Sequence, residues 1–128
     1  MYRAFGLLRP DSDFTLEQAH TYLTAKFPGF AVTLDGDRVV VSKGEWWIAV
    51  ALVSGPLVRS ETEGLLGHLA GVEPAEALAL TESDRRVEVW TDVPDPFIEH
   101  FNDYLLVVEV LKTFKGLIAI DPKEPAVL

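Results

Sequence analysis

Residues 46–53 read Trp-Trp-Ile-Ala-Val-Ala-Leu-Val, an apolar run that no polar residue interrupts. An antiparallel strand with one face in water alternates apolar and polar residues, and this run does not alternate. We therefore expect a strand that is covered on both faces. The cover is either two helices of the same chain, one on each face, or a second protein chain.

The segments before this run predict that it is the third strand of a meander. Residues 30–34 form a strand-like segment that ends at Asp35-Gly36-Asp37, and residues 38–42 form another that ends at Lys43-Gly44-Glu45. Tight turns that contain glycine join neighbouring antiparallel strands. Two further short strands are expected at residues 2–8 and 117–120.

Three helices are predicted from capping signals and helical spacing. The first, at residues 15–27, and the second, at residues 60–70, each begin with a capping box, in which a hydroxyl residue is followed three positions later by Gln or Glu. The third, at residues 95–115, has Asp95 as its N-cap, followed by a proline. Residues 105–111 are apolar around most of the helix, which is typical of a buried helix.

Residues 73–81 fit either a helix or a strand. Pro74 suits the first turn of a helix, whereas residues 78–81 also suit a strand. Residues 86–91 alternate between apolar and polar types, which favours a strand. We therefore predict a hairpin of residues 78–81 with 86–91, joined by Glu82-Ser83-Asp84.

Together these elements predict a single α+β domain over residues 1–128, with a loose tail from about residue 122. The antiparallel sheet consists of the meander, the hairpin and the two short strands. With three helices interspersed, the predicted order is β-α-β-β-β-α-β-β-α-β.

The composition is that of a globular protein, with 48% hydrophobic and 24% charged residues. The net charge of −9 would repel nucleic acid and anionic membranes, so neither is expected as a partner, and it suits solubility or a basic partner. No apolar run approaches the roughly 20 residues of a membrane helix. The first residues do not resemble a signal peptide, so we expect a cytoplasmic protein.

The sequence contains no catalytic or metal-binding constellation that we recognise. It has no cysteine, and no two of its three histidines are three or four residues apart. Asp95, Glu99 and Asp103 are spaced four apart, which predicts an acidic stripe along the third helix, beside His100. A solvated stripe is the favoured interpretation, and an acid–base or metal site is the alternative. We therefore predict no catalytic residue, no metal and no cofactor.

Large apolar side chains are the candidate contacts with another protein. Tryptophan brings a large contact area at a low entropy cost and is enriched at interfaces. The two glycines on either side of Leu65-Leu66 allow close backbone approach, either to the sheet or to a partner helix. The candidate interface residues are Trp46, Trp47, Trp90, Leu65 and Leu66.

The order of the predicted elements resembles that of a known fold. Without the first and last strands, the order is helix, three strands, helix, two strands, helix. This order resembles the type III secretion chaperone-like fold, which YbjN-type proteins also resemble. The resemblance implies a homodimer that binds extended segments of a client protein and performs no chemistry. In size and acidity the chain is also similar to bacterial immunity proteins, whose acidic surface would face a basic site on a toxin.

From these observations we expect a non-enzymatic, chaperone-like and homodimeric protein-binding domain. One alternative is an immunity-type protein that neutralises a toxin. The other is a small carboxylate-dependent enzyme or ligand binder, which a cavity gathering Asp95, Glu99, His100 and Asp103 would favour.

Overall fold

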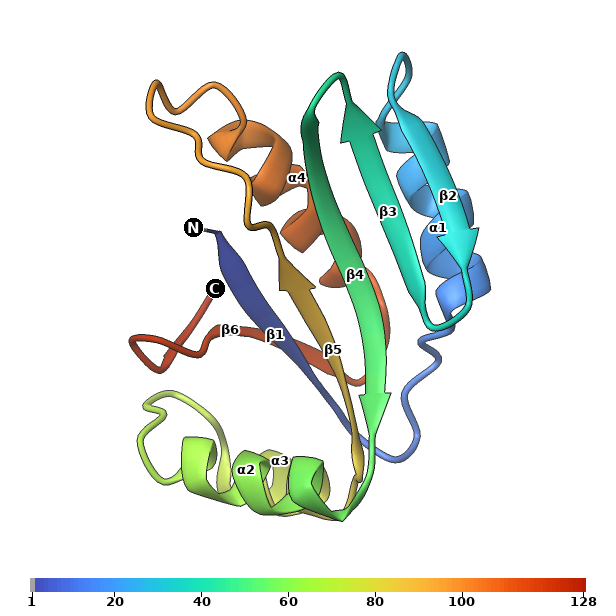
Figure 1. The fold of residues 1–128 in the computed structure, drawn as a ribbon. Helices are drawn as coiled ribbons and strands as arrows, with labels where there is room; N and C mark the ends of the chain where they lie inside the picture. Colours follow the sequence, from blue (N-terminus) through green and yellow to red (C-terminus); the bar gives the residue numbers. More distant parts are fainter. Residues whose placement is uncertain (1) are drawn as a thin grey trace.

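The computed structural model describes residues 2–128 as one antiparallel sheet of seven strands with four helices (Figure 1). The strands are β1 (Arg3–Leu8), β2 (Ala31–Asp35), β3 (Arg38–Lys43), β4 (Trp46–Ser54), β5 (Arg85–Trp90), β6 (Leu117–Asp121) and β7 (Ala126–Val127). The helices are α1 (Leu16–Lys26), α2 (Pro56–Leu66), α3 (Pro74–Thr81) and α4 (Phe101–Leu111). The spatial order β2-β3-β4-β5-β1-β6-β7 places β1 in the interior of the sheet. The predicted class, α+β with an antiparallel sheet, is confirmed.

The predicted meander is also confirmed. In the β2–β3 hairpin Asp35 is in register with Arg38, and β3 and β4 close on the pair Lys43 and Trp46. Gly36 and Gly44 in these turns have φ values of 62° and 61°. Only glycine adopts such left-handed angles without steric cost, so these two residues determine where the chain reverses.

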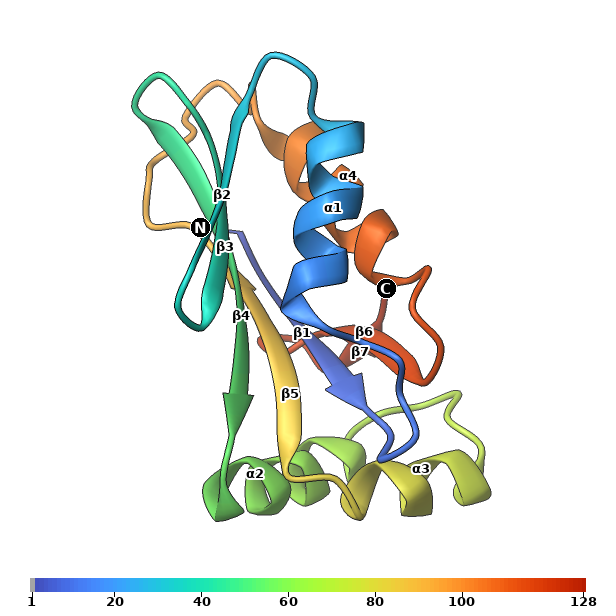
Figure 2. The same ribbon diagram turned by 90° about the vertical axis from the view of Figure 1, so that its right-hand side faces the viewer.

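One face of the sheet packs against α1 and α4, which lie on the same side in Figure 2. Six side chains that point to this side from β3, β4 and β5 are fully buried, and they are Val39, Val41, Ile48, Val50, Val87 and Val89. Leu23 of α1 and Leu111 of α4 meet them from the helix side. This layer forms the main hydrophobic core.

The opposite face is covered by helices only at one end. Phe5, Leu7 and Ile120 of the sheet form a second, smaller cluster with Leu80 of α3, and Leu65 of α2 packs against it. Both helices lie at the lower end of the molecule in Figures 1 and 2. No helix within residues 2–128 has the length and apolar character needed to cross a membrane.

The apolar run of β4 is covered by the chain itself. Its first face packs toward α1 and α4. On its second face Ala49 and Ala51 are buried, although no helix of the described chain lies over them. Arg38 is in register with Ala51 on one side, and Trp90 is in register with Ala49 on the other. The Arg38 guanidinium lies 5.4 Å from the Trp90 ring, so the two side chains meet above the small alanines. The lack of alternation therefore needs no second chain.

Residues 74–81 form the helix α3, so the predicted hairpin strand at residues 78–81 is wrong. Pro74 occupies the first turn, and Ala, Glu and Leu, which favour helices, follow it. Leu80 is buried against the sheet. β5 pairs instead with β4 and β1, and the chain has four helices rather than three.

The start of α2 also differs from the prediction. The helix begins at Pro56 rather than at Ser60. Gly55, with a φ of 139°, ends β4, and the proline takes the favoured first helical position. Val58 and Thr62 then form the buried side of the helix, so the residues of the predicted capping box lie inside the helix.

α4 begins at Phe101 rather than at Asp95. The intervening residue Ile98 has a φ of 57°, which is incompatible with a continuous right-handed helix. Residues 95–100 form an irregular turn in place of the predicted first helical turn.

The end of the chain pairs with the sheet. Ala126 and Val127 form β7 against β6, in register with Asp121 and Ile120. The amide of Leu128 donates to the Ala119 carbonyl at 2.9 Å. The predicted loose tail from about residue 122 thus includes a two-residue strand, and its looseness stays a prediction.

A pair of glycine substitutions tests how closely the connection between α4 and β6, at Gly116, packs against Ser12. At Gly116, φ is 72° and a Cβ would lie 3.1 Å from Ser12 Cα, whereas Gly29, with a φ of 86°, has open space around it. Alanine in the left-handed region costs about 1–2 kcal/mol at either position. Crowding adds about 1–3 kcal/mol at Gly116 alone. We expect urea denaturation to show a larger loss for Gly116→Ala than for Gly29→Ala, and equal losses would show that Ser12 moves aside.

Candidate binding surfaces

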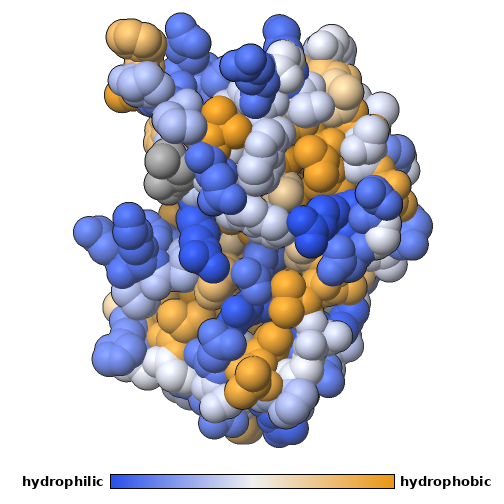
Figure 3. All heavy atoms as spheres, viewed as in Figure 1, coloured by the Kyte–Doolittle hydropathy of each residue, from blue (hydrophilic) through white to orange (hydrophobic). Residues whose placement is uncertain are grey.

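Beyond α2 and α3, the sheet face opposite α1 and α4 has no helix over it in the described chain (Figure 1). We call this region the open face, and its members are Arg3, Arg38, Val40, Trp47 and Trp90. Cross-strand register places them on one side, since Val40 is in register with Ala49, Ala49 with Trp90, and Trp90 with Arg3. Figure 3 shows that this side of the molecule mixes hydrophilic and hydrophobic residues.

The candidate interface residues are distributed over three environments. Trp47 and Trp90 are half-buried on the open face. Trp46 points to the opposite side because neighbours on a strand alternate, and it is buried with its ring stacked 4.3 Å from that of His100. Leu65 and Leu66 are half-buried against the smaller core cluster. The structure thus brings two of the five residues, Trp47 and Trp90, to a common surface.

Two adjoining clefts lie on this side of the molecule, with Arg3 and Lys123 in the walls of both. The first, of about 610 Å³, is also lined by Tyr2, Glu88, Trp90, Thr91 and Asp92. The second, of about 560 Å³, extends toward α2 and is also lined by Phe5, Glu61, Gly64, Leu65, His68 and Pro122. Both walls mix charged side chains with aromatic or apolar ones, which suits a ligand that is oriented by ion pairs.

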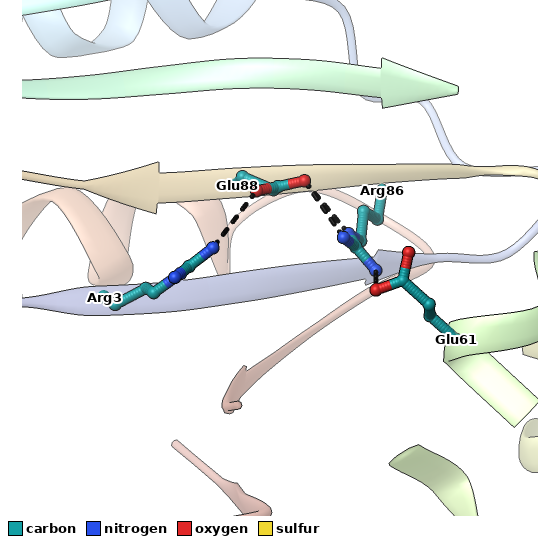
Figure 4. Close-up of polar contacts among 4 residues, drawn as sticks. All are labelled: Arg3, Glu61, Arg86 and Glu88. Carbon is teal, nitrogen blue, oxygen red and sulfur yellow. Dashed lines mark hydrogen bonds and ion pairs between the residues drawn. The ribbon is translucent and has the colours of Figure 1, made fainter. Parts of the chain in front are cut away.

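A chain of ion pairs joins residues that line the two clefts (Figure 4). Glu88 accepts hydrogen bonds from Arg86 Nε at 3.2 Å and Nη2 at 3.1 Å, and its other oxygen lies 3.8 Å from Arg3. The guanidinium of Arg86 lies 4.2 Å from the centre of the Phe5 ring, and its Nη1 lies 3.5 Å from Glu61 of α2. The sequence analysis missed this network. The only signal was the Arg-Val-Glu alternation of residues 86–88, which places both charges on one face of β5.

Removal of the Arg86 side chain tests the contribution of this network to stability. The side chain is only 7% exposed, so Arg86→Ala leaves Glu88 with a single, more distant partner. Breaking a buried pair in this way costs about 3 kcal/mol. Arg85→Ala is the matched control, since Arg85 is the neighbouring half-buried arginine and makes no ion pair within residues 2–128. Similar losses of free energy of unfolding for the two variants would show that the network contributes little.

The turn before α4 is organised by one carboxylate. Asp95 accepts hydrogen bonds from the Glu99 and His100 amides, both at 2.9 Å, and from the Tyr2 hydroxyl. Only Asp103 of the predicted acidic stripe lies within α4, and its carboxylate is 2.9 Å from His100 Nδ1. The three carboxylates therefore do not line one helix face, and that prediction is wrong because the helix begins later.

The titration of Asp95 and Tyr2 reflects their mutual contact. Burial acts to raise the pKa of Asp95. The hydrogen bonds from Tyr2, from the amides of His100 and Glu99, and the nearby His100 charge outweigh it and lower that pKa below its ordinary value. Burial, and then the contact with Asp95, raise the pKa of Tyr2 to about 12. Asp95 stays ionised with its oxygens occupied by donors, which is the role of a structural group.

Substitution of Asp95 by asparagine should produce a pH-dependent loss of stability. The folded-state pKa is below the ordinary value of 3.8, so the contribution is present above that pH and is lost as the pH falls through the folded-state pKa. We expect Asp95→Asn to unfold at lower urea than the wild type near neutral pH, with the difference closing in strong acid. In the variant the pKa of Tyr2 should fall from about 12 but stay above its ordinary value of 10.0, because burial, the larger cause of the shift, remains; NMR titration measures it. A difference that does not change with pH would contradict this role.

The same turn exposes two large apolar side chains. Phe97 is 82% exposed and Ile98 is 67% exposed, and we call this pair the apolar tip. The loop that carries it rises beside the top of β4 in Figure 1, and hydrophobic colour is visible there in Figure 3. The sequence analysis missed the tip because it placed both residues in a helix, where Phe97 would have faced the core.

Asp95, Glu99, His100 and Asp103 are not gathered around any of three clefts in the described part of the chain. Within residues 2–128 no three His, Asp or Glu side chains are grouped so that they could hold a metal ion. The two clefts described above and a third of about 500 Å³ between α1 and α4 are lined by other residues than Asp95, Glu99, His100 and Asp103.

No family model, curated protein or solved structure matches this chain. The order of elements that carries the resemblance to the type III secretion chaperone-like fold differs from the observed order, because α3 replaces the first strand of the predicted hairpin.

Proposed function

We propose that this protein is a non-enzymatic binding domain that recognises another protein through its open face. The observation that carries the proposal is the pair of half-buried tryptophans, Trp47 and Trp90, on a helix-free part of the sheet beside two adjoining clefts. Tryptophan is prominent among the residues that carry most of the energy of protein interfaces. In a chaperone-like role, the clefts would accept an extended segment of a cytoplasmic client.

The carboxylate-dependent enzyme has less support than this binding role. Its candidate residues line none of the three clefts. The Asp95 carboxylate already accepts three hydrogen bonds, and Asp103 pairs with His100. An acid–base pair needs a carboxyl group that reaches a bound substrate, and these groups are engaged within the chain.

We further propose that the open face supports a homodimer. The chain has a net charge of −9, so two copies repel each other unless the contact is locally neutral. Arg3 and Arg38 bring positive charge to the open face. The buried Arg86 forms an ion pair with Glu88, which also lies near Arg3. This local balance makes the open face more favourable for self-association than the acidic remainder of the surface.

A charge introduced in the middle of the open face tests the dimer. Val40 is half-buried there and does not contact the core beneath α1 and α4, so Val40→Lys should fold normally. We expect the wild type to sediment as a dimer at tens of micromolar and Val40→Lys as a monomer. Ala25→Lys, on the exposed side of α1, is the control and should remain dimeric. A monomeric wild type would contradict the homodimer.

Site-specific crosslinking tests the wider proposal. A photoreactive residue at position 40 should crosslink to a partner in a host lysate, whereas the same residue at position 25 should not. Equal crosslinking at both positions would remove the open face as the binding surface.

A further inference from the structure

The apolar tip is held in one conformation before any partner arrives. Asp95 accepts hydrogen bonds from two backbone amides of the turn, and the Ile98 amide donates to the Asp95 carbonyl at 3.1 Å. Pro96 lies between Asp95 and the tip, and its ring fixes the φ angle at this position. A surface that is already ordered binds with a smaller loss of conformational entropy than a flexible one.

Ile98 carries a conformational cost that the hydrogen bonds of the turn offset, whereas its side chain gains little packing within the chain. Its φ of 57° is unusual for a β-branched residue, and its side chain is mostly exposed. Glycine would adopt the same angle without strain. An exposed and strained apolar side chain indicates a contact made outside the chain.

Two further exposed apolar side chains follow the tip in sequence, on α4. Phe101 and Leu105 are one helical turn apart, and they are 39% and 41% exposed. Soluble proteins expose few groups of large apolar side chains, and such groups often mark binding sites.

The charges around the tip decide which kind of partner fits. Between Arg86 and Lys112 the chain has no lysine or arginine. The acidic residues of this interval are Glu88, Asp92, Asp95, Glu99, Asp103 and Glu109. Glu99 is next to the tip in sequence and is exposed, whereas Asp92 lines the first cleft together with Arg3 and Lys123. This charge repels an anionic membrane and a second acidic copy of the chain, and it attracts a basic partner.

We propose that the apolar tip docks a basic segment of another protein, with an apolar side chain of that segment against Phe97 and Ile98. Lysine or arginine side chains of the segment pair with Glu99 beside the tip. The inference rests on the proposed function, which is that the protein binds other proteins. It adds that one partner is a basic segment with an apolar side chain, and that this segment binds at the apolar tip rather than at the open face.

Peptide binding tests the proposal. The probe is a labelled peptide of alternating lysine and leucine, followed by fluorescence anisotropy, with a glutamate–leucine peptide and a lysine–serine peptide as comparisons. We expect binding of the lysine–leucine peptide alone, weakened about tenfold or more by Phe97→Ser. Leu57→Ser is the matched control, since Leu57 on α2 is 75% exposed, and it should bind as the wild type does.

Charge and conformation are tested separately. Glu99→Gln should weaken binding several-fold and reduce its salt dependence, whereas Glu63→Gln on α2 should change neither. Ile98→Gly should raise the urea midpoint, because the strain is relieved, and should weaken peptide binding. A purely structural role for Ile98 predicts that peptide binding is unchanged.

Three outcomes would overturn the inference. They are equal binding of the glutamate–leucine peptide, binding of anionic lipid vesicles that depends on Phe97, and self-association that is lost in Phe97→Ser. Val40→Lys should leave peptide binding unchanged. If Val40→Lys loses the dimer while Phe97→Ser binds the peptide as the wild type does, only the apolar-tip inference is rejected. If Phe97→Ser loses peptide binding while Val40→Lys remains dimeric, only the open-face proposal is rejected.

Discussion

Burial of one sheet face beneath α1 and α4 is the constraint on which the rest of the structure depends. The side chains that point to this side from the central strands are fully buried valines and isoleucine. Since side chains alternate along a strand, fixing this set also fixes which residues point the other way. Trp47, Trp90 and Arg38 reach the open face because Ile48, Val89 and Val39, their sequence neighbours, are in the core.

Helices cover the second face at one end and not at the other. At one end α2 and α3 cover Phe5 and Leu7, and Arg86 connects the sheet to α2 through Glu61. At the other end Arg38 and Trp90 extend over two alanines of β4. Small residues in the central strand allow large side chains from both neighbouring strands to meet above it. The result is a polar and aromatic surface that needs no helix.

The turn before α4 combines a strong local constraint with an exposed apolar surface. Asp95 holds the backbone through its carboxylate, and the contact with Tyr2 connects this turn to the chain just before β1. The same hydrogen bonds that order the turn direct Phe97 and Ile98 outward. Rigidity and exposure therefore have one cause at this position.

The sequence by itself determined the elements whose signals are local. The meander follows from Gly36 and Gly44, which permit left-handed turns, and α1 follows from Thr15, whose hydroxyl accepts from the Gln18 amide at 3.2 Å. The absence of alternation in β4 matches the burial of Ile48 and Val50 on one face and of Ala49 and Ala51 on the other, although helices cover only the first face. These features depend on the conformational preferences of a few neighbouring residues.

Only the tertiary structure decided the features that depend on residues distant in the sequence. The insertion of β1 between β5 and β6 requires pairing of strands from opposite parts of the chain. Residues 78–81 form a helix because Leu80 packs against the sheet, although their local sequence also allowed a strand. The start of α4, and with it the acidic stripe and the exposure of Phe97, was decided by hydrogen bonds to Asp95, including one from Tyr2. No pattern of adjacent residues encodes a contact of that range, because its energy exists only once the chain has folded.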